Sequence, residues 1–258
     1  MGNFKGLLIC SDIDGTFAGN GIEEVNREAV KYFIKNGGKF CFSTGRPVNY
    51  LKNMSFFDAI NAPCCLFNGA IVYDYQREEI IFEKRLDYNV SEFLSTVDGF
   101  RDKMTFLCIY DNISDDGIIC SDISCLSDEQ KSIVPLKLVC CFGDERHADE
   151  FKRKAMECKL FKDTSYISKS WNTGVEFNSL NATKGDALKF IKSYLGETEK
   201  AYGIGDYEND EPLLRMADVG VAVGNALDSV KAVSDRQVKP CLQGALADLI
   251  EKIENGEM

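Results

Sequence analysis

The sequence predicts an α/β fold whose mainly parallel sheet is interrupted by an inserted α+β domain. Short apolar segments alternate with amphipathic segments from Gly6 to about Phe67, and the same alternation returns after Lys184. This alternation is typical of parallel strands joined by crossover helices. The middle of the chain lacks it. We therefore expect a discontinuous core of residues 1–85 and 179–258 and an inserted domain of residues 86–178.

The first part of the core should contain three strands and two helices. Apolar runs predict strands at Gly6–Asp12, Lys39–Ser43 and Cys64–Phe67. A helix at Glu23–Asn36, ended by Gly37 and Gly38, and a helix after Pro47 should connect them. A hairpin is expected next, from Ile71–Tyr73 and Ile80–Glu83 around a polar turn.

The inserted domain and the second part of the core follow from the same patterns. In the insertion we expect strands at Thr105–Tyr110, Gly117–Cys120, Leu136–Phe142 and Gly174–Phe177, with helices at Ser91–Val97 and Glu145–Glu157. After it we expect a helix from Lys184 to Leu195, a strand at Ala201–Ile204, a helix at Asn209–Met216, a strand at Val219–Val223 and a closing helix near Leu246–Ile253.

An acidic pair, Asp12 and Asp14, follows the first apolar strand. Side chains alternate along a strand, so both carboxylates should leave its end in the same direction. Such a pair needs a cation, and Mg²⁺ takes one or two carboxylates together with water and phosphate oxygens. Open α/β sheets bind ligands at this strand end, where Gly15 allows a sharp turn. On this motif alone, an Asp-rich turn remains the alternative.

Three further segments supply what a phosphate site would need. The run Ser43–Pro47 places a hydroxyl and the Arg46 guanidinium after the second strand, although Arg46 could instead form a structural ion pair. Lys184 begins an amphipathic helix, where its charge could neutralise a carboxylate and a phosphate. The run Gly205–Asp210 adds a second acidic cluster at a strand end.

Taken in this order, the four segments resemble the haloacid dehalogenase superfamily of phosphatases, in particular its Cof-type branch with a large cap. Asn68-Gly69-Ala70 matches a further step of that pattern. The resemblance implies a Rossmann-like core, an inserted cap, and Mg²⁺-dependent hydrolysis through an aspartyl-phosphate. The chemistry is coherent, because phosphoryl transfer needs an in-line nucleophile, positioning and neutralised charge.

The resemblance also implies a role for each matched residue. Asp12 would be the nucleophile, and Asp14 would be the general acid and base, which requires a proton near neutral pH. Mg²⁺ would be held by the Asp12 carboxylate, the Asp14 main-chain carbonyl and Asp206. The phosphoryl group would be bound by Thr44, the Ile13 and Gly45 amides, Arg46 and Lys184, with Asn209 alongside and Asp210 in support.

Composition narrows the partners and the location. The net charge of −11 disfavours general binding to nucleic acid. The apolar runs are far shorter than the roughly 18 residues of a membrane span, and no leader opens the chain. We therefore expect a cytoplasmic protein that binds a small phosphorylated metabolite, with no nucleic acid, membrane or obligate protein partner.

The 11 cysteines and the single histidine argue against other chemistry. The number of cysteines is odd, no CxxC pair occurs, and several lie in apolar strands, so most are expected to be reduced core residues rather than zinc ligands. His147 lies in a charged run typical of a solvated helix start, which argues against a Ser-His-Asp triad.

We conclude from the sequence that the protein is a Mg²⁺-dependent phosphomonoester hydrolase, with a sugar phosphate as the expected substrate class. A phosphomutase of the same superfamily and a catalytically silent metabolite-binding module are the alternatives. The cap should select the leaving group, and its candidate contacts are Tyr110, Trp171, Asn172 and Glu176. Trp171 could equally belong to the cap core. The sequence sets neither the particular metabolite nor the oligomeric state.

Overall fold

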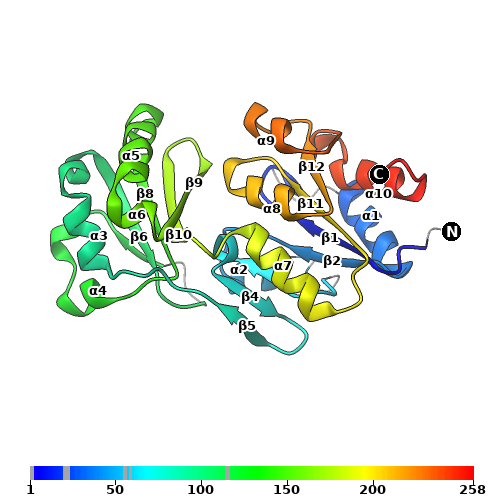
Figure 1. Ribbon diagram of the computed structural model, residues 1–258, viewed down its shortest axis with the longest axis horizontal. Helices are drawn as coiled ribbons and strands as arrows, with labels where there is room; N and C mark the ends of the chain where they lie inside the picture. The colour runs from blue at the N-terminus through cyan, green and yellow to red at the C-terminus, as the bar shows by residue number, and fades with distance from the viewer. Residues whose placement is uncertain (1–2, 20–23, 55–56, 58–59, 114–116) are drawn as a thin grey trace.

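The computed structural model describes residues 3–19, 24–54, 57, 60–113 and 117–258. Within these residues the strands form two five-stranded sheets and one three-stranded sheet. The two larger sheets lie toward opposite ends of the long axis of the molecule (Figure 1). No helix among the described residues combines the length and the apolar character needed to cross a membrane.

The core sheet is entirely parallel, with the strand order β13-β12-β11-β1-β2. Its strands are β1 (Leu7–Ser11), β2 (Lys39–Phe42), β11 (Lys200–Gly205), β12 (Val219–Val223) and β13 (Arg236–Val238). The chain proceeds outward from β1 to β2 on one side and from β11 through β12 to β13 on the other. The order therefore reverses between β1 and β11, which is where open α/β sheets bind ligands.

Helices cover both faces of this sheet. Crossovers between parallel strands are right-handed, so opposite directions of progression place the connecting helices on opposite faces. Accordingly, α1 packs against α10, and α7 packs against α8. The helices associated with the core are α1 (Glu24–Lys35), α2 (Val48–Lys52), α7 (Lys184–Leu195), α8 (Glu211–Met216), α9 (Asp228–Val233) and α10 (Ala245–Glu254).

One predicted strand of the parallel series pairs differently. Strand β3 (Cys64–Leu66) joins β4 (Ile71–Asp74) and β5 (Glu79–Glu83) in an antiparallel sheet. It meets the core sheet through an isolated parallel bridge between Ser43 and Cys65 and through a hydrogen bond from the Phe42 amide to Cys64 Sγ. The reason is the tight turn after β3, where Asn68 and Gly69 have φ values of 61° and 121°. A turn this short leaves no room for a crossover helix, so the next strand pairs antiparallel.

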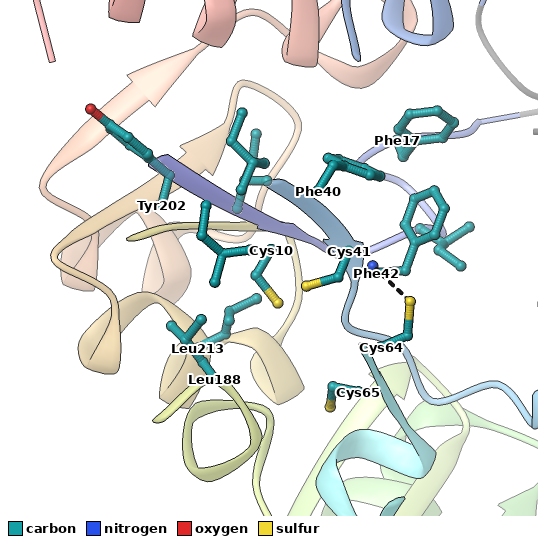
Figure 2. Packing of buried hydrophobic residues seen from close by; sticks show 14 of the residues in the cluster. Cys10, Phe17, Phe40, Cys41, Phe42, Cys64, Cys65, Leu188, Tyr202 and Leu213 are labelled. Atoms are coloured by element: carbon teal, nitrogen blue, oxygen red, sulfur yellow. Dashed lines mark hydrogen bonds between the residues drawn. The ribbon is translucent and has the colours of Figure 1, made fainter. Parts of the chain in front are cut away.

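The core interior is built from aromatic rings and thiols. The rings of Phe17 and Phe40 each lie 5.0 Å from that of Phe42, edge to face. Cys10 and Cys41 are directly paired in β1 and β2 and lie side by side (Figure 2). All 11 cysteines are reduced; Cys125 is exposed, Cys158 is half-buried, and the others are buried, in line with the prediction that most are reduced core residues.

The inserted segment forms an antiparallel sheet of order β7-β6-β8-β10-β9. Its strands are β6 (Met104–Tyr110), β7 (Ile118–Cys120), β8 (Lys137–Phe142), β9 (Ser165–Trp171) and β10 (Gly174–Ser179). Its helices are α3 (Val90–Thr96), α4 (Asp128–Ser132), α5 (Glu145–Glu157) and α6 (Lys159–Lys162).

The two faces of the inserted sheet have different neighbours. On β8, Leu138, Cys140 and Phe142 belong to the apolar cluster that includes residues of α3, α5 and α6. The alternate residues Lys137 and Val139 line a cavity instead. Because side chains alternate along a strand, one face of the sheet is held by helices and the other is turned to the cavity.

Most expected elements are present, with several additions. The structure adds β9, β13, α4, α6 and α9, and splits the expected helix at Asn209–Met216 into a 3₁₀ turn at Glu208–Asp210 followed by α8. Further 3₁₀ turns span Phe67–Gly69, Asp98–Lys103, Ile123–Cys125 and Cys241–Gln243. The predicted helix start at Glu23 lies outside the described residues. The domain boundaries at residues 86 and 178 remain predictions.

Candidate active site

A cavity of about 400 Å³ opens between the core and the inserted sheet. Residues just beyond the carboxyl ends of β1, β2 and β11 form one wall, and the cavity-facing residues of the inserted sheet form the other. The lining residues are Asp12, Asp14, Thr44, Gly45, Arg46, Tyr110, Lys137, Val139, Ser170, Trp171, Glu176, Asp206, Tyr207 and Asn209.

Asp12 lies at the centre of the core wall. It follows β1 directly, and its amide donates a hydrogen bond to the Ile204 carbonyl at 3.0 Å, which continues the pairing of β1 with β11. Its Oδ1 accepts from Lys184 Nζ at 2.7 Å, and the same ammonium donates to Asp210 Oδ1 at 2.6 Å. The three side chains are almost fully buried. Buried charges require such pairing.

The start of α7 fixes the position of Lys184. Thr183 caps this helix: its hydroxyl accepts from the Asp186 amide, and the Asp186 carboxylate accepts from the Thr183 amide. Lys184 is therefore the first helical residue, with its side chain buried between the two carboxylates. Burial lowers the pKa of Lys184, but Asp12 and Asp210 outweigh this effect and hold the pKa above its usual value.

The turn after β11 brings two more carboxylates to the site. Asp210 Oδ2 accepts from the backbone amides of Asp206 and Tyr207, at 2.9 and 3.1 Å. Asp206 Oδ1 accepts from the Thr16 hydroxyl at 3.0 Å. Asp206 also packs against Gly15, which has a φ of 85° and where a Cβ would lie 2.5 Å from Asp206 Oδ2. Glycine is thus required for both the backbone angle and the close approach.

The carboxylates fit a divalent cation. One oxygen from each of Asp12, Asp206 and Asp210 lies within 4.8 Å of the others. Both Asp210 oxygens already accept hydrogen bonds, whereas within the described part of the chain none falls on Oδ2 of Asp12 or Asp206. Oxygen donors of this kind suit Mg²⁺. The residues present therefore fit the metal: Asp12 and Asp206 could serve as ligands and Asp210 as support.

Charge balance leads to the same conclusion. Burial, and then the neighbouring carboxylates Asp210 and Asp206, raise the pKa of Asp12 well above its usual value, against the effect of Lys184. Burial and Asp210 also raise the pKa of Asp206 to about 7. Three carboxylates around one ammonium leave an excess of negative charge, which a divalent cation would compensate.

Asp14 and Arg46 form an ion pair at the cavity edge. Arg46 Nε donates to Asp14 Oδ2 at 2.9 Å, and an Arg46 terminal nitrogen donates to Asp14 Oδ1 at 3.1 Å. The guanidinium also lies 4.5 Å from the centre of the Tyr50 ring. This is the ion pair that the sequence left open as an alternative for Arg46. Both side chains are about half exposed and line the cavity, so a ligand there can reach them.

The other predicted phosphate-binding groups lie at the ends of β1 and β2. Thr44 is buried: its amide donates to the Cys65 carbonyl at 2.9 Å, and its hydroxyl accepts from the Arg46 amide at 3.2 Å. Gly45 lines the cavity. The Ile13 side chain belongs to the hydrophobic core, while its carbonyl accepts from the Thr16, Phe17 and Ala18 amides. The backbone therefore turns tightly beside Asp12.

Asn209 connects the core to the inserted sheet. Its Nδ2 donates to Asn68 Oδ1 at 3.1 Å and to Ser170 Oγ at 2.8 Å. Asn68 in turn donates to Glu176 Oε2 at 2.6 Å. Asn209 is thus engaged with the inserted sheet in addition to lining the cavity.

The residues predicted for the inserted domain are distributed unevenly. Tyr110, Trp171 and Glu176 line the cavity, whereas Asn172 accepts a hydrogen bond from the Tyr207 hydroxyl at 2.7 Å and is not among the lining residues. Sequence reasoning missed four lining residues: Lys137, Val139, Ser170 and Tyr207. Two of these residues could have been predicted to lie near the site from the sequence. Lys137 is a charged residue at the start of an apolar strand, and Tyr207 directly follows Asp206.

Comparisons with known proteins identify the family and the fold. The family model for haloacid dehalogenase-like hydrolases matches residues 9–250. Phosphatase YwpJ of Bacillus subtilis (strain 168) is 26% identical, covering 88% of this chain and 93% of its own. From the same organism, 5-amino-6-(5-phospho-D-ribitylamino)uracil phosphatase YcsE is 25% identical, covering 88% of each chain. The solved structure of the HAD subclass IIB sugar phosphatase BT4131 has the same fold, with a TM-score of 0.79 and 21% identity over 95% of this chain and 98% of that one.

Proposed function

The chain belongs to the haloacid dehalogenase-like hydrolases, as its motifs predict, and on this basis we propose that it is a Mg²⁺-dependent phosphatase of small phosphorylated metabolites. The observation that carries the proposal is the buried contact of Lys184 with both Asp12 and Asp210, beside Asp206. Phosphoryl transfer to a carboxylate needs this combination of nucleophile, counter-charge and metal ligands.

Asp12 is the proposed nucleophile. One Asp12 oxygen attacks phosphorus and forms an acyl phosphate as the bond to the leaving oxygen breaks. Lys184 keeps the carboxylate and the arriving phosphate from repelling each other, and Thr44 with the Gly45 and Ile13 amides orients the phosphoryl oxygens. When bound by Asp12, Asp206 and the Asp14 carbonyl, Mg²⁺ supplies Lewis acidity toward a phosphoryl oxygen.

Asp14 is the proposed proton carrier. It protonates the leaving alkoxide and afterwards takes a proton from the water that hydrolyses the acyl phosphate. Arg46 holds this carboxylate at the cavity edge through two hydrogen bonds. An arriving phosphate competes for the guanidinium, which would release the Asp14 carboxyl from this ion pair.

The substrate class is proposed on the character of the second wall and on the relatives. Tyr110, Trp171, Ser170 and Glu176 give that wall both apolar surface and hydrogen-bonding groups, as a sugar phosphate requires. Curated relatives carry phosphatase names, and one structural neighbour is described as a sugar phosphatase. The cap role of residues 86–178 and the cytoplasmic location are part of the same proposal.

The test is hydrolysis of p-nitrophenyl phosphate by the purified protein. We expect phosphate release with Mg²⁺ and loss of activity in EDTA, restored by excess Mg²⁺. Full activity in EDTA would refute the metal assignment. Transfer of phosphate to a second sugar hydroxyl in preference to water would identify a phosphomutase, and a complete lack of turnover with retained Mg²⁺-dependent ligand binding would identify a silent binding module.

A further inference from the structure

A buried ion pair forms part of the cavity wall contributed by the inserted sheet. Lys137, at the start of β8, and Glu176, in β10, lie in neighbouring strands, with Nζ 2.5 Å from Oε1. Their side chains are 4% and 2% exposed, and both line the cavity. A buried ion pair contributes little net stability, because desolvation offsets the attraction. Its place in the cavity wall suggests a role in binding.

The two partners differ in what they can still bind. Glu176 Oε2 already accepts from Asn68 Nδ2 at 2.6 Å and from Ser170 Oγ at 2.5 Å, in addition to the contact of Oε1 with Lys137. An ammonium has three N–H donors. One N–H of the Lys137 ammonium is directed to Glu176. The distance from Lys137 Nζ to the Gly45 carbonyl oxygen is long, at 3.4 Å. Lys137 therefore retains donor capacity, whereas the carboxylate is largely satisfied.

Lys137 also lies beside the proposed phosphoryl pocket. A Cβ on Gly45 would lie 3.1 Å from Lys137 Nζ and 2.9 Å from Asn68 Oδ1. Glycine at this position thus lets the ammonium approach the backbone whose amide is proposed to bind the phosphoryl group. The first atoms of a leaving group attached to that phosphoryl group would pass close to Lys137.

The charged groups around the cavity limit the charge that the leaving group can carry. The cations are Arg46, Lys137 and Lys184, and the carboxylates are Asp12, Asp14, Asp206, Asp210 and Glu176. One divalent metal ion offsets the excess of carboxylates, and the phosphate then adds its own negative charge. Lys137 is already paired with Glu176. No cation remains unpaired in the described cavity wall to receive a second anionic group.

We propose that Lys137 is a specificity-determining residue that donates a hydrogen bond to a hydroxyl or carbonyl oxygen of an uncharged leaving group. The substrates are accordingly monophosphates of neutral polyhydroxy compounds, in preference to bisphosphates and phosphorylated acids. The inference deepens the proposed phosphatase function and rests on it.

The experiment compares kcat/KM for five substrates: ribitol 5-phosphate, glucose 6-phosphate, fructose 1,6-bisphosphate, 3-phosphoglycerate and p-nitrophenyl phosphate. Wild type should favour the two neutral monophosphates by about tenfold or more over the bisphosphate and the acid. Lys137→Met should lower kcat/KM for the neutral monophosphates about tenfold, mainly through KM, and change p-nitrophenyl phosphate hydrolysis by less than about threefold. Lys154→Met is the matched control, because Lys154 pairs with Glu150 within α5 and is not among the cavity-lining residues.

Two outcomes would overturn the inference. One is a wild-type preference for the bisphosphate or the phosphorylated acid, and the other is an equal loss on all five substrates in Lys137→Met. If Lys137→Met fails to fold, Lys137→Met/Glu176→Gln removes both charges, and the same substrate-dependent loss is expected of it. Failure of the proposed function would differ from both outcomes, because wild type would then be inactive on p-nitrophenyl phosphate with Mg²⁺.

Discussion

The two walls of the cavity hold buried charges in opposite ways. In the core wall, Asp12, Asp206 and Asp210 surround the single ammonium of Lys184, so negative charge is in excess. In the other wall, Glu176 is matched by Lys137 and by hydrogen bonds from Asn68 and Ser170. The pKa values reflect this contrast: burial raises the pKa of Asp12, whereas for Glu176 the effect of burial is outweighed by Lys137, Ser170 and Asn68, which lower the pKa.

The contrast separates two tasks. A carboxylate cluster with excess negative charge is suited to bind a cation and to hold a reactive carboxylate. Its charges would be balanced only when metal and phosphate are bound. A compensated pair keeps its geometry without a ligand and can serve as a fixed hydrogen-bonding surface. We therefore propose that the core wall carries the chemistry and that the inserted wall selects the substrate. The following predictions test this division, from the largest expected effect to the smallest.

Asp12→Asn should abolish turnover, with a fall in kcat of about 10⁴-fold or more, because the amide is a poor nucleophile. The protein should remain folded, since the change removes a buried charge. Reaction of wild type with ³²P-labelled substrate, quenched within a single turnover, should leave label on the peptide that contains Asp12. Release of the leaving group with no labelled Asp12 peptide at any time in the turnover would exclude the covalent route.

Lys184→Met should lower kcat/KM by about 10²- to 10³-fold, because the negative charge of the transition state loses the ammonium that stabilises it. It should also lower the free energy of unfolding by about 3–5 kcal/mol, since Asp12 and Asp210 would be buried without a counter-charge. The control is Lys192→Met on the same helix, where a surface ion pair with Asp218 is lost. That variant should change stability by less than about 1 kcal/mol and leave activity unchanged. Near wild-type activity of Lys184→Met would show that Lys184 is only structural.

Mg²⁺ should raise the melting temperature more at pH 8 than at pH 5.5. The pKa of Asp206 is about 7 in the folded protein, against about 4 in an unfolded chain. This group therefore stabilises the metal-free protein fully below about pH 4, and its contribution is lost as the pH rises through 7. At pH 5.5 Mg²⁺ must displace the proton bound to Asp206, whereas at pH 8 Asp206 is already ionised.

The size of this effect follows from binding linkage. At a Mg²⁺ concentration of about 100 Kd the gain should approach 2.7 kcal/mol at pH 8, measured by calorimetry. Asp206→Asn should show little gain at either pH. Equal gains at both pH values, or an undiminished gain in Asp206→Asn, would contradict the assignment of Asp206 as a ligand.

Trp171→Ala should have the smallest effect on chemistry. Trp171 lies in the inserted wall and is 41% exposed, so its loss should reorder kcat/KM among sugar phosphates. The kcat/KM for an aryl phosphate should change by less than about threefold, because such a substrate makes few contacts with the inserted wall. The exposure of Trp171 contradicts the alternative that it belongs to the cap core. Uniform loss on all substrates would mean that Trp171 supports closure or local folding instead of substrate choice.

The core wall could be predicted from the sequence because its residues follow strand ends. Asp12, Thr44 and Asp206 come shortly after β1, β2 and β11, and parallel strands bring their carboxyl ends to one edge of a sheet. The local sequence therefore predicted both which residue types form the core wall and that they lie close together in space. The pairing of β3 was the exception, because the backbone angles of its turn decide it.

The inserted wall could not be predicted in the same way. Lys137 and Ser170 lie in separate strands far apart in the sequence, and whether they come together depends on the register of β8, β10 and β9. The sequence Ser165–Trp171 has few apolar residues, so β9 itself was missed. The polar strand β13 (Arg236–Val238) was missed for the same reason.

The alternation along β8 has a consequence for how such a protein can evolve. Leu138, Cys140 and Phe142 pack on the helical side, whereas Lys137 and Val139 face the cavity. Mutations at the cavity-facing positions can therefore change substrate preference while the apolar packing of the same strand is conserved. Lineages that diverge in substrate should accumulate differences at every second residue of this strand. A directed-evolution library confined to those positions would sample new specificities at little cost in folding yield.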